Sequence, residues 1–249
     1  IEKVLLEIMP DFVVIYGDVN SSLSGAIAAV KQQIKVIHIE SGCRSFDKKM
    51  PEEINRILID NISDLLFCTE QSAFNNLIKM GFSSDSIFNV GNTAIDTLHD
   101  LNLKSNPYDI KYYLCTLHRP FNVDETDKLQ LILDKLNKFN HKVVIPTHPR
   151  LKKNINKKYD NIIFIDPLGY LDFITTLKFS EGVISDSGGV QCETSFFKKP
   201  MLTLRKSTEH LLTLNHGNKL VDLKNLHYKT FASIKTQPTP KEWDGNASK

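Results

Sequence analysis

Residues 10–40 read PDFVVIYGDVNSSLSGAIAAVKQQIKVIHIE. An apolar run follows Pro10, small and apolar residues at helical spacing occupy 21–33, and a second apolar run covers 35–40. Short continuous apolar strands separated by helices are typical of a parallel sheet that helices cover on both faces. This stretch therefore predicts an α/β fold, and the rest of the chain repeats its pattern.

The alternation continues on both sides of one break. Residues 101–110, LNLKSNPYDI, lose the periodicity and contain Pro107, which makes them the best linker candidate. We therefore predict two doubly wound, Rossmann-like domains at 1–105 and 106–249, with ligands bound at the carboxyl ends of the strands in a cleft between the lobes. The predicted strands are 10–18, 35–40, 65–69, 86–91, 112–118, 142–148, 161–166, 182–187 and 201–205, and the predicted helices are 21–33, 52–64, 72–81, 126–139, 169–180 and 190–199.

The composition excludes several function classes. The chain has 249 residues, of which 41% are hydrophobic, as in a soluble globular protein. Its 31 basic and 29 acidic residues leave a net charge of +2, so the charge balance does not indicate a nucleic-acid-binding protein. No uncharged apolar run reaches the ~18–20 residues of a membrane span. The spacing of Cys43, Cys68, Cys115 and Cys192 fits neither a metal site nor a redox motif, which predicts reduced thiols, a cytoplasmic location and no bound metal.

Carboxylates follow the first two predicted strands, as Asp18 and Glu40. If these strands are neighbours, the two side chains lie together, and their repulsion raises the pKa of one, as acid–base catalysis requires. The alternative for Glu40 is an ion pair with Arg44 that stabilises a loop, and His38 is expected to be structural.

A third acidic group opens the next predicted helix, in MPEEINR at 50–56. Acidic residues in a first turn are favoured by the helix dipole. Glu52 and Arg56 are also four residues apart and can pair on the helix surface. By itself, this segment is therefore interpreted as structural.

Basic residues follow two strands of the second lobe. His118 and Arg119 leave one strand, where an imidazole could transfer a proton near neutral pH and a guanidinium could bind phosphate through two hydrogen bonds. His148 and Arg150 leave the next strand in the same way. For His148, a loop histidine before a proline is an equally good interpretation.

The sharpest local signal is ISDSGGVQCE at 184–193. Gly188 and Gly189 let backbone amides approach a ligand, and the helix that follows offers its unpaired N–H groups to an anion. Ser187 adds a hydroxyl donor, and Glu193 lies one turn into the helix, where it could accept hydrogen bonds from a ribose diol. The pattern indicates a phosphate site, although a plain tight turn is the alternative.

Together these motifs resemble the non-hydrolysing UDP-N-acetylglucosamine 2-epimerases, across nearly the whole chain. That resemblance implies a glycosyltransferase-B-like pair of Rossmann lobes, and an enzyme that interconverts UDP-GlcNAc and UDP-ManNAc through a glycal intermediate without a cofactor. The matching motifs are PDFVVIYGD, HIESGCRS, MPEEINR, VGNTAIDTL, LHRPFNVD, THPR, DPLGYLDF, SDSGGVQCE, KPMLTLR and WDG.

The resemblance also implies a role for each site residue. Asp18, Glu40 and Glu52 resemble the acid–base carboxylates, and His118 resembles the essential histidine near the leaving diphosphate. Ser187, Gly188 and Gly189 would hold phosphate, Glu193 the ribose, and Phe173 the uracil, whereas Arg119 and His148 resemble positions of a regulatory pocket.

The chain departs from the family pattern at three places. The family's N-terminal strand and glycine-arginine loop have no counterpart before Ile1, and its last helix has none after WDG, so we expect a fragment that is inactive alone. The third departure is STEHLL at 207–212, where the family has Thr-Glu-Arg-Pro-Glu. His210 replaces an arginine that helps bind the nucleotide, so a fixed charge becomes a titratable one.

These departures leave alternatives open. The leading expectation is a homodimeric UDP-sugar 2-epimerase of surface-polysaccharide synthesis, with a UDP-sugar as its ligand and neither nucleic acid nor membrane as partner. The alternatives are a 2-epimerase of a modified sugar such as a UDP-diacetamido-uronic acid, a glycosyltransferase of the same fold, and an inactive UDP-binding homologue.

Overall fold

The computed structural model describes residues 1–103 and 105–249. Their contacts divide the chain into two compact units. The domain boundary expected between residues 105 and 106 stays a prediction, and nothing in the sequence indicated that two later segments return to unit 1. Unit 1 comprises Ile1–Asp100, Thr208–Leu212 and Lys241–Lys249, and unit 2 comprises Leu101–Ser207 and Thr213–Pro240.

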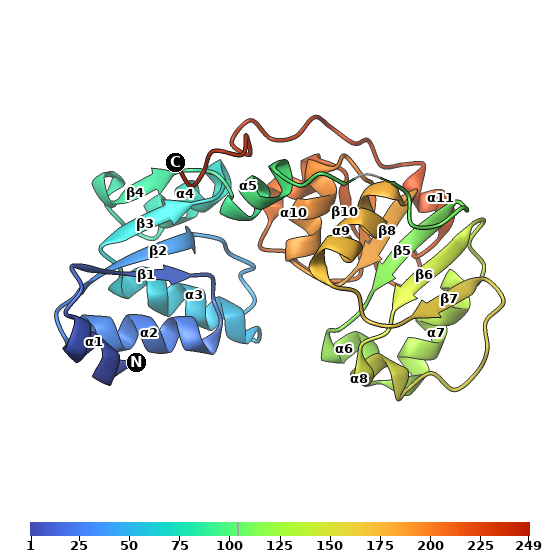
Figure 1. Ribbon diagram of the computed structural model, residues 1–249, viewed down its shortest axis with the longest axis horizontal. Coiled ribbons are helices and arrows are strands. Elements are labelled where there is room, and N and C mark those ends of the chain that lie inside the picture. Colours follow the sequence, from blue (N-terminus) through green and yellow to red (C-terminus); the bar gives the residue numbers. More distant parts are fainter. Residues whose placement is uncertain (104) are drawn as a thin grey trace. The chain divides into compact units, whose positions relative to one another are not determined.

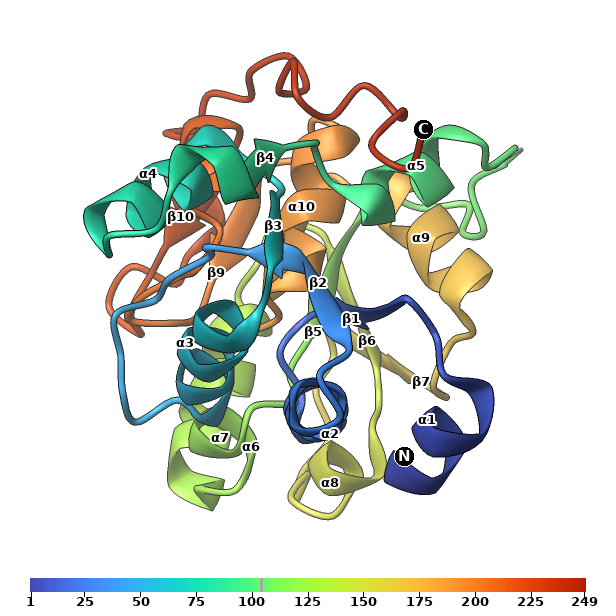
Figure 2. The same ribbon diagram turned by 90° about the vertical axis from the view of Figure 1, so that its left-hand side faces the viewer.

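Unit 1 is built on a parallel sheet with the strand order β1-β2-β3-β4 (Figure 1). Buried Ala26 and Ala29 of α2 pack with Val36 of β2 and Ile59 of α3, and Figure 2 shows α2 end-on beside β1 and β2. The elements are α1 (Glu2–Ile8), β1 (Phe12–Tyr16), α2 (Asn20–Lys31), β2 (Lys35–Ser41), α3 (Pro51–Ile62), β3 (Leu65–Cys68), α4 (Gln71–Lys79), η1 (Ser84–Ser86), β4 (Ile87–Asn89) and α5 (Thr93–His99).

Unit 2 contains a parallel sheet with the order β10-β9-β8-β5-β6-β7. Side chains alternate across β5, so Tyr113 and Cys115 pack with helix α7 on one face, whereas Leu114 packs with α9 and α10 on the other. The elements are β5 (Tyr112–Thr116), α6 (Pro120–Val123), α7 (Thr126–Leu136), β6 (Lys142–Pro146), α8 (Pro149–Lys152), β7 (Ile162–Ile165), α9 (Tyr170–Phe179), β8 (Gly182–Ser185), α10 (Gly189–Phe196), β9 (Met201–Thr203), β10 (Asn218–Leu220) and α11 (Tyr228–Phe231). The short helix η2 (Leu211–Asn215) begins in unit 1 and ends in unit 2.

The strand order of unit 2 reverses between β5 and β8. From β5 the chain continues to β6 on one side, whereas β8 pairs with β5 on the other side and leads on to β9. In open α/β sheets, ligands bind at the carboxyl ends of the two strands that flank such a reversal. Those ends lead here into His118 and into Ser187, both of which the sequence analysis selected.

The predicted α/β fold class with parallel sheets is confirmed. Several short elements were not predicted, among them α1, β10 and α11, because they carry few apolar residues or precede the first clear apolar run. Within 1–103 and 105–249, no helix is both long and apolar enough to cross a membrane. All four cysteines are buried.

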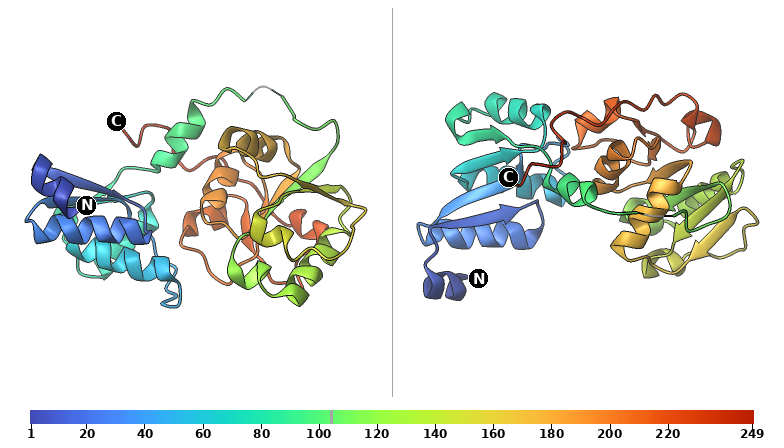
Figure 3. Two further views of the ribbon diagram at one scale, coloured as in Figure 1. Left: turned by 60° about the horizontal axis from the view of Figure 1, so that its bottom comes forward. Right: turned by 45° about the horizontal axis from the view of Figure 1, so that its top comes forward.

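The C-terminal segment belongs to unit 1 and is anchored there by specific contacts. The indole of Trp243 is buried and donates to the carbonyl of Thr69 at 3.0 Å. Backbone amides of Ala247 and Ser248 donate to the carboxylate of Asp96 at 3.1 and 2.7 Å, so the segment ends beside α5 (Figure 3).

Gly42 follows β2 and leaves no space for a side chain. Its φ is +76°, and a Cβ would meet the carbonyl oxygen of Ala73 at 2.4 Å. Gly81 has a φ of +93°, but a Cβ there would meet nothing within 4 Å. We expect Gly81→Ala to cost about 1–2 kcal/mol from backbone strain, and Gly42→Ala to cost a further ~1–3 kcal/mol from overpacking.

Chemical denaturation of the two glycine variants measures this difference directly. Equal losses of unfolding free energy in Gly42→Ala and Gly81→Ala would contradict the close packing of this turn against α4.

Candidate functional site

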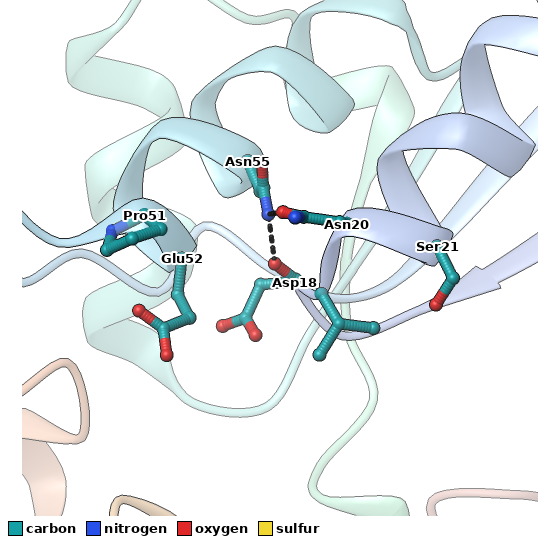
Figure 4. Close-up of a pocket in the computed structure, with 7 residues that line it drawn as sticks. Asp18, Asn20, Ser21, Pro51, Glu52 and Asn55 are labelled. Atoms are coloured by element: carbon teal, nitrogen blue, oxygen red, sulfur yellow. Dashed lines mark hydrogen bonds between the residues drawn. The ribbon is translucent and has the colours of Figure 1, made fainter. Parts of the chain in front are cut away.

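A pocket of about 380 Å³ opens at the carboxyl end of the unit 1 sheet. The carboxylates of Asp18 and Glu52 face the same space, the first from the end of β1 and the second from the first turn of α3 (Figure 4). Asn55 donates from its side-chain amide to the Asp18 carbonyl oxygen at 2.8 Å and to Asn20 Oδ1 at 3.0 Å. The loop that carries Asp18 is therefore held by a helix side chain.

Arg56 neutralises part of the negative charge around this pocket. Its side chain is 4% exposed and pairs with Asp18 Oδ2 at 2.7 Å and with Glu53 Oε2 at 2.9 Å. A third carboxylate, that of Glu209, lies 3.5 Å from its Nη2 atom. Arg56 thus pairs with Glu53, three residues before it on α3, and the pairing with Glu52 considered from the sequence stays a prediction.

Glu40 lies at an irregular position at the end of β2. Its φ is +69°, and the pairing of β2 with β3 shifts register between Ile39 and Ser41. Such a conformation costs about 1–3 kcal/mol in a residue other than glycine and is concentrated at functional sites. Glu40 Oε2 lies 3.7 Å from the place that a Cβ on Gly17 would take, and the charge of Asp18 acts on the Glu40 carboxyl.

The environment of Glu40 favours its protonated form. Burial raises the pKa of the Glu40 carboxyl above its ordinary value; the charge of His210 lowers it, and that of Asp18 raises it. The net shift is upward, so the Glu40 carboxyl keeps its proton to a higher pH than an ordinary glutamate does. Arg44, the alternative partner considered for Glu40, pairs with Asp60 at 2.5 Å.

The segment 208–212 joins unit 1 through carboxylates. Leu212 donates its backbone N–H to Glu70 Oε1 at 3.3 Å, and His210 Nε2 lies 3.9 Å from Glu209 Oε1. Burial raises the pKa of the Glu70 carboxyl, and the charge of His210 lowers it. His210 therefore lies among carboxylates of unit 1, and its part in substrate binding stays a prediction.

In unit 2, Asp186 connects the ends of β5 and β8. Its fully buried carboxylate accepts hydrogen bonds from the backbone N–H groups of His118 and Arg119 and from the Asn122 amide, at 3.0 to 3.3 Å. His118 Nδ1 lies 3.1 Å from Asp186 Oδ1, and its imidazole is 44% exposed. Burial would raise the pKa of Asp186, but the hydrogen bonds from His118 and Asn122 outweigh it and lower that pKa.

The expected phosphate loop, residues 187–189, begins α10. Gly188 caps the helix without a side-chain hydrogen bond, and a Cβ added at Gly189 would meet nothing within 4 Å. The space beside Gly189 is therefore open to a ligand. Behind it, burial raises the pKa of Glu193 to about 7, and a hydrogen bond with Tyr170 partly offsets that rise.

Two other candidates have structural contacts. The half-buried ring of Phe173 packs with a core cluster that includes Leu114 and Leu177. The exposed His148 caps α8, because its Nδ1 accepts from the Arg150 N–H at 3.3 Å. The binding roles given to Phe173, Arg119 and His148 stay predictions.

The chain is similar to known proteins in both sequence and structure. The sequence profile of the family described as UDP-N-acetylglucosamine 2-epimerase matches residues 1–237. The UDP-N-acetylglucosamine 2-epimerase of Methanococcus maripaludis is 41% identical, over 89% of this chain and 67% of that protein. The UDP-2,3-diacetamido-2,3-dideoxy-D-glucuronate 2-epimerase of Pseudomonas aeruginosa is 43% identical, over 84% of this chain and 62% of that protein. The chain thus spans about two thirds of the length of these relatives.

Solved structures confirm the fold class. The crystal structure of Methanocaldococcus jannaschii UDP-GlcNAc 2-epimerase in complex with UDP-GlcNAc and UDP gives a TM-score of 0.86 at 38% identity, covering 98% of this chain and 76% of that chain. A spinosyn rhamnosyltransferase, at 12% identity and a TM-score of 0.55, covers 93% of this chain and 65% of its own, a likeness of the glycosyltransferase-B-like fold alone. The chain belongs to the UDP-N-acetylglucosamine 2-epimerase family, a family of isomerases.

Proposed function

We propose that the protein interconverts UDP-GlcNAc and UDP-ManNAc by elimination and re-addition of UDP. A carboxylate removes the proton from C2, the electrons of that C–H bond form the C1–C2 double bond, and the C1–O bond breaks to release UDP. UDP then adds back to C1 of the glycal while a proton is delivered to the opposite face of C2. The products balance without an oxidant, a reductant or a metal.

The observation that carries this proposal is the group of carboxylates around the unit 1 pocket. Asp18 and Glu52 face one pocket, and Glu40 lies near Asp18 with a raised pKa. A reaction that removes a proton from one face of C2 and returns it to the other needs one ionised and one protonated acid. Carboxylates with different environments meet this requirement, and we propose Asp18, Glu40 and Glu52 for these roles.

The unit 2 residues are proposed to bind the nucleotide. Ser187, Gly188 and Gly189 would present backbone and hydroxyl donors to the diphosphate at the start of α10. His118, held by Asp186, would stabilise the charge that develops on the leaving phosphate. Glu193 would accept hydrogen bonds from the ribose, and Phe173 would lie against the uracil. His210, which belongs to unit 1, would contact the substrate.

A modified UDP-sugar is the second candidate substrate. The Pseudomonas aeruginosa relative with 43% identity is named for a UDP-diacetamido-dideoxy-glucuronate. His210 lies where the family pattern has an arginine, and a change of cation at a sugar site can alter which ring substituents are accepted. Assays with both UDP-sugars under the same conditions decide between the two, and UDP binding without any turnover would identify an inactive homologue instead.

The remaining proposals rest on resemblance to the family. We propose that the whole protein works as a homodimer in the cytoplasm, and that it supplies a sugar for surface polysaccharide. Arg119 and His148 are proposed for a regulatory pocket.

Glu193 makes nucleotide binding dependent on pH. With a pKa of about 7, its carboxyl is protonated below neutral pH and ionised above it. An ionised carboxylate accepts stronger hydrogen bonds from hydroxyl groups than a neutral acid does. UDP affinity should therefore increase up to about tenfold as the pH rises through 7, for one charge-assisted hydrogen bond gained.

Calorimetric titration of UDP below and above neutral pH tests this dependence. The Glu193→Gln variant is the matched control, since UDP itself ionises identically in both titrations. An equal pH dependence in the two proteins would remove Glu193 from the binding site.

A further inference from the structure

His38 lies in the interior of β2 and is fully buried, yet both its ring nitrogens face oxygen atoms. Nδ1 lies 2.5 Å from Asp60 Oδ1, and Nε2 lies 3.0 Å from the carbonyl oxygen of Gly17. A neutral imidazole has one donor and one acceptor nitrogen. The Gly17 carbonyl can only accept, so Nε2 must carry a hydrogen.

Asp60 is equally committed to accepting. Its Oδ2 atom accepts from the Gly42 N–H at 3.2 Å and from Arg44 Nη2 at 2.5 Å, and its side chain is fully buried. With Oδ2 accepting from two donors and Oδ1 facing the imidazole, the Asp60 carboxylate accepts from His38 Nδ1. A neutral His38 would therefore direct a lone pair at one of its two oxygen neighbours.

One of the two hydrogen bonds of His38 ends at the backbone that carries Asp18. Gly17 has a φ of +66°, and its carbonyl belongs to the peptide that joins it to Asp18. The next carbonyl, that of Asp18, is held by Asn55. Buried side chains therefore fix both peptides that flank the Asp18 side chain.

The charges around His38 explain how a buried cation is tolerated there. The charged groups facing it are Asp60 of α3, Arg44 after β2 and Glu40 of β2, whereas the Cys68 thiol of β3 is neutral because burial raises its pKa to about 12. With His38 protonated, two cations face Asp60 and Glu40. The Asp60 carboxylate contacts both cations, and His38 lowers the pKa of Glu40 against the effect of burial.

We propose that His38 is a buried imidazolium that donates from both ring nitrogens, fixes the Gly17–Asp18 peptide and supplies positive charge beside Glu40. It is a positioning residue, because it acts on the reaction through Asp18 and Glu40. This role rests on the proposed epimerase function, whereas the protonation of His38 does not.

Nitrogen NMR of the full-length protein tests the protonation without any substitution in the cluster. In ¹⁵N-labelled wild type near neutral pH, both ring nitrogens of His38 should show protonated shifts, with His38→Gln used only to assign the signal. One unprotonated ring nitrogen would overturn the proposal, even if the variant fails to fold.

Kinetics test the positioning role. His38→Gln keeps a donor toward Gly17 but turns an oxygen toward Asp60, and we expect kcat to fall about 10²-fold from misplacement of the site, with KM nearly unchanged. Adding Asp60→Asn restores a donor toward the Gln oxygen, while the remaining Asn oxygen still accepts from Gly42 and Arg44. The double variant should regain part of kcat. The apparent pKa that Glu40 contributes to the pH–rate profile should stay higher than in the wild type, because the imidazolium is gone.

If the variants fold and have the kcat and the pH–rate profile of the wild type, His38 has only a packing role and the positioning proposal is wrong. If wild-type protein itself fails to epimerise any UDP-sugar, the proposed function fails, and the NMR result still decides the state of His38.

Discussion

Replacing Asp18 with Asn is expected to lower kcat by about 10²–10⁴-fold, the usual contribution of a general acid or base. The Asn side chain keeps the shape and one oxygen acceptor for Arg56, so the pocket should persist. It cannot take up or release a proton, and it removes one of the charges that raise the pKa of Glu40. The loss should therefore appear in turnover and only weakly in UDP binding.

Asp85→Asn provides the matched control, since Asp85 is an exposed residue of η1 in the same unit. Turnover by full-length protein and UDP affinity by calorimetry should be measured for both variants. Asp18→Asn with turnover equal to Asp85→Asn would remove Asp18 from the catalytic group.

Replacing Arg56 with Met should have the largest effect on stability. Burial alone would lower the pKa of Arg56, but Asp18 and Glu209 outweigh it and raise that pKa, so its charge is firmly held. Methionine fills a similar volume but leaves Asp18, Glu53 and Glu209 facing one another. Removing one partner of a buried ion pair costs about 3–5 kcal/mol, and we expect a loss of unfolding free energy in that range.

Arg150→Met is the control for Arg56→Met. Arg150 lies 3.3 Å from Asp124, but both side chains are about half exposed, at 50% and 47%. Exposed pairs contribute about 0–1 kcal/mol. In urea denaturation, the losses of unfolding free energy in the two variants should therefore differ by roughly 2 kcal/mol or more. Similar denaturation midpoints would contradict this prediction and would mean that the carboxylates take up protons instead of repelling one another.

Local pattern was sufficient for the fold because it determines which segments can be buried. The apolar run before Asp18 and the run around His38 form the neighbouring strands β1 and β2. The expectation that helices cover both faces fails at β1, where Phe12, Val14 and Tyr16 are exposed. The glycine turn after β8 was visible from local pattern as well, since two adjacent glycines and a following helix form a local motif.

Contacts between distant segments were not predictable from pattern. The pairing of His38 with Asp60 joins the middle of a strand to a helix, and neither residue type is unusual for its element. The return of 208–212 to unit 1 was also missed, because it depends on a backbone hydrogen bond to Glu70 and an ion pair between Arg56 and Glu209. His210 belongs to this returning segment, and its charge acts on Glu40 of unit 1.

The central claim is proton exchange at C2, and one experiment measures it directly. Full-length protein would be incubated with UDP-GlcNAc in D2O and the sugar followed by proton NMR. The account predicts a new anomeric signal of the manno sugar and loss of the C2 proton signal in both epimers, as solvent deuterium replaces the abstracted proton. A manno signal that appears with C2 still fully protonated would contradict proton removal by the carboxylates around Asp18, and no manno signal from UDP-GlcNAc or the diacetamido-uronate substrate would contradict the epimerase function itself.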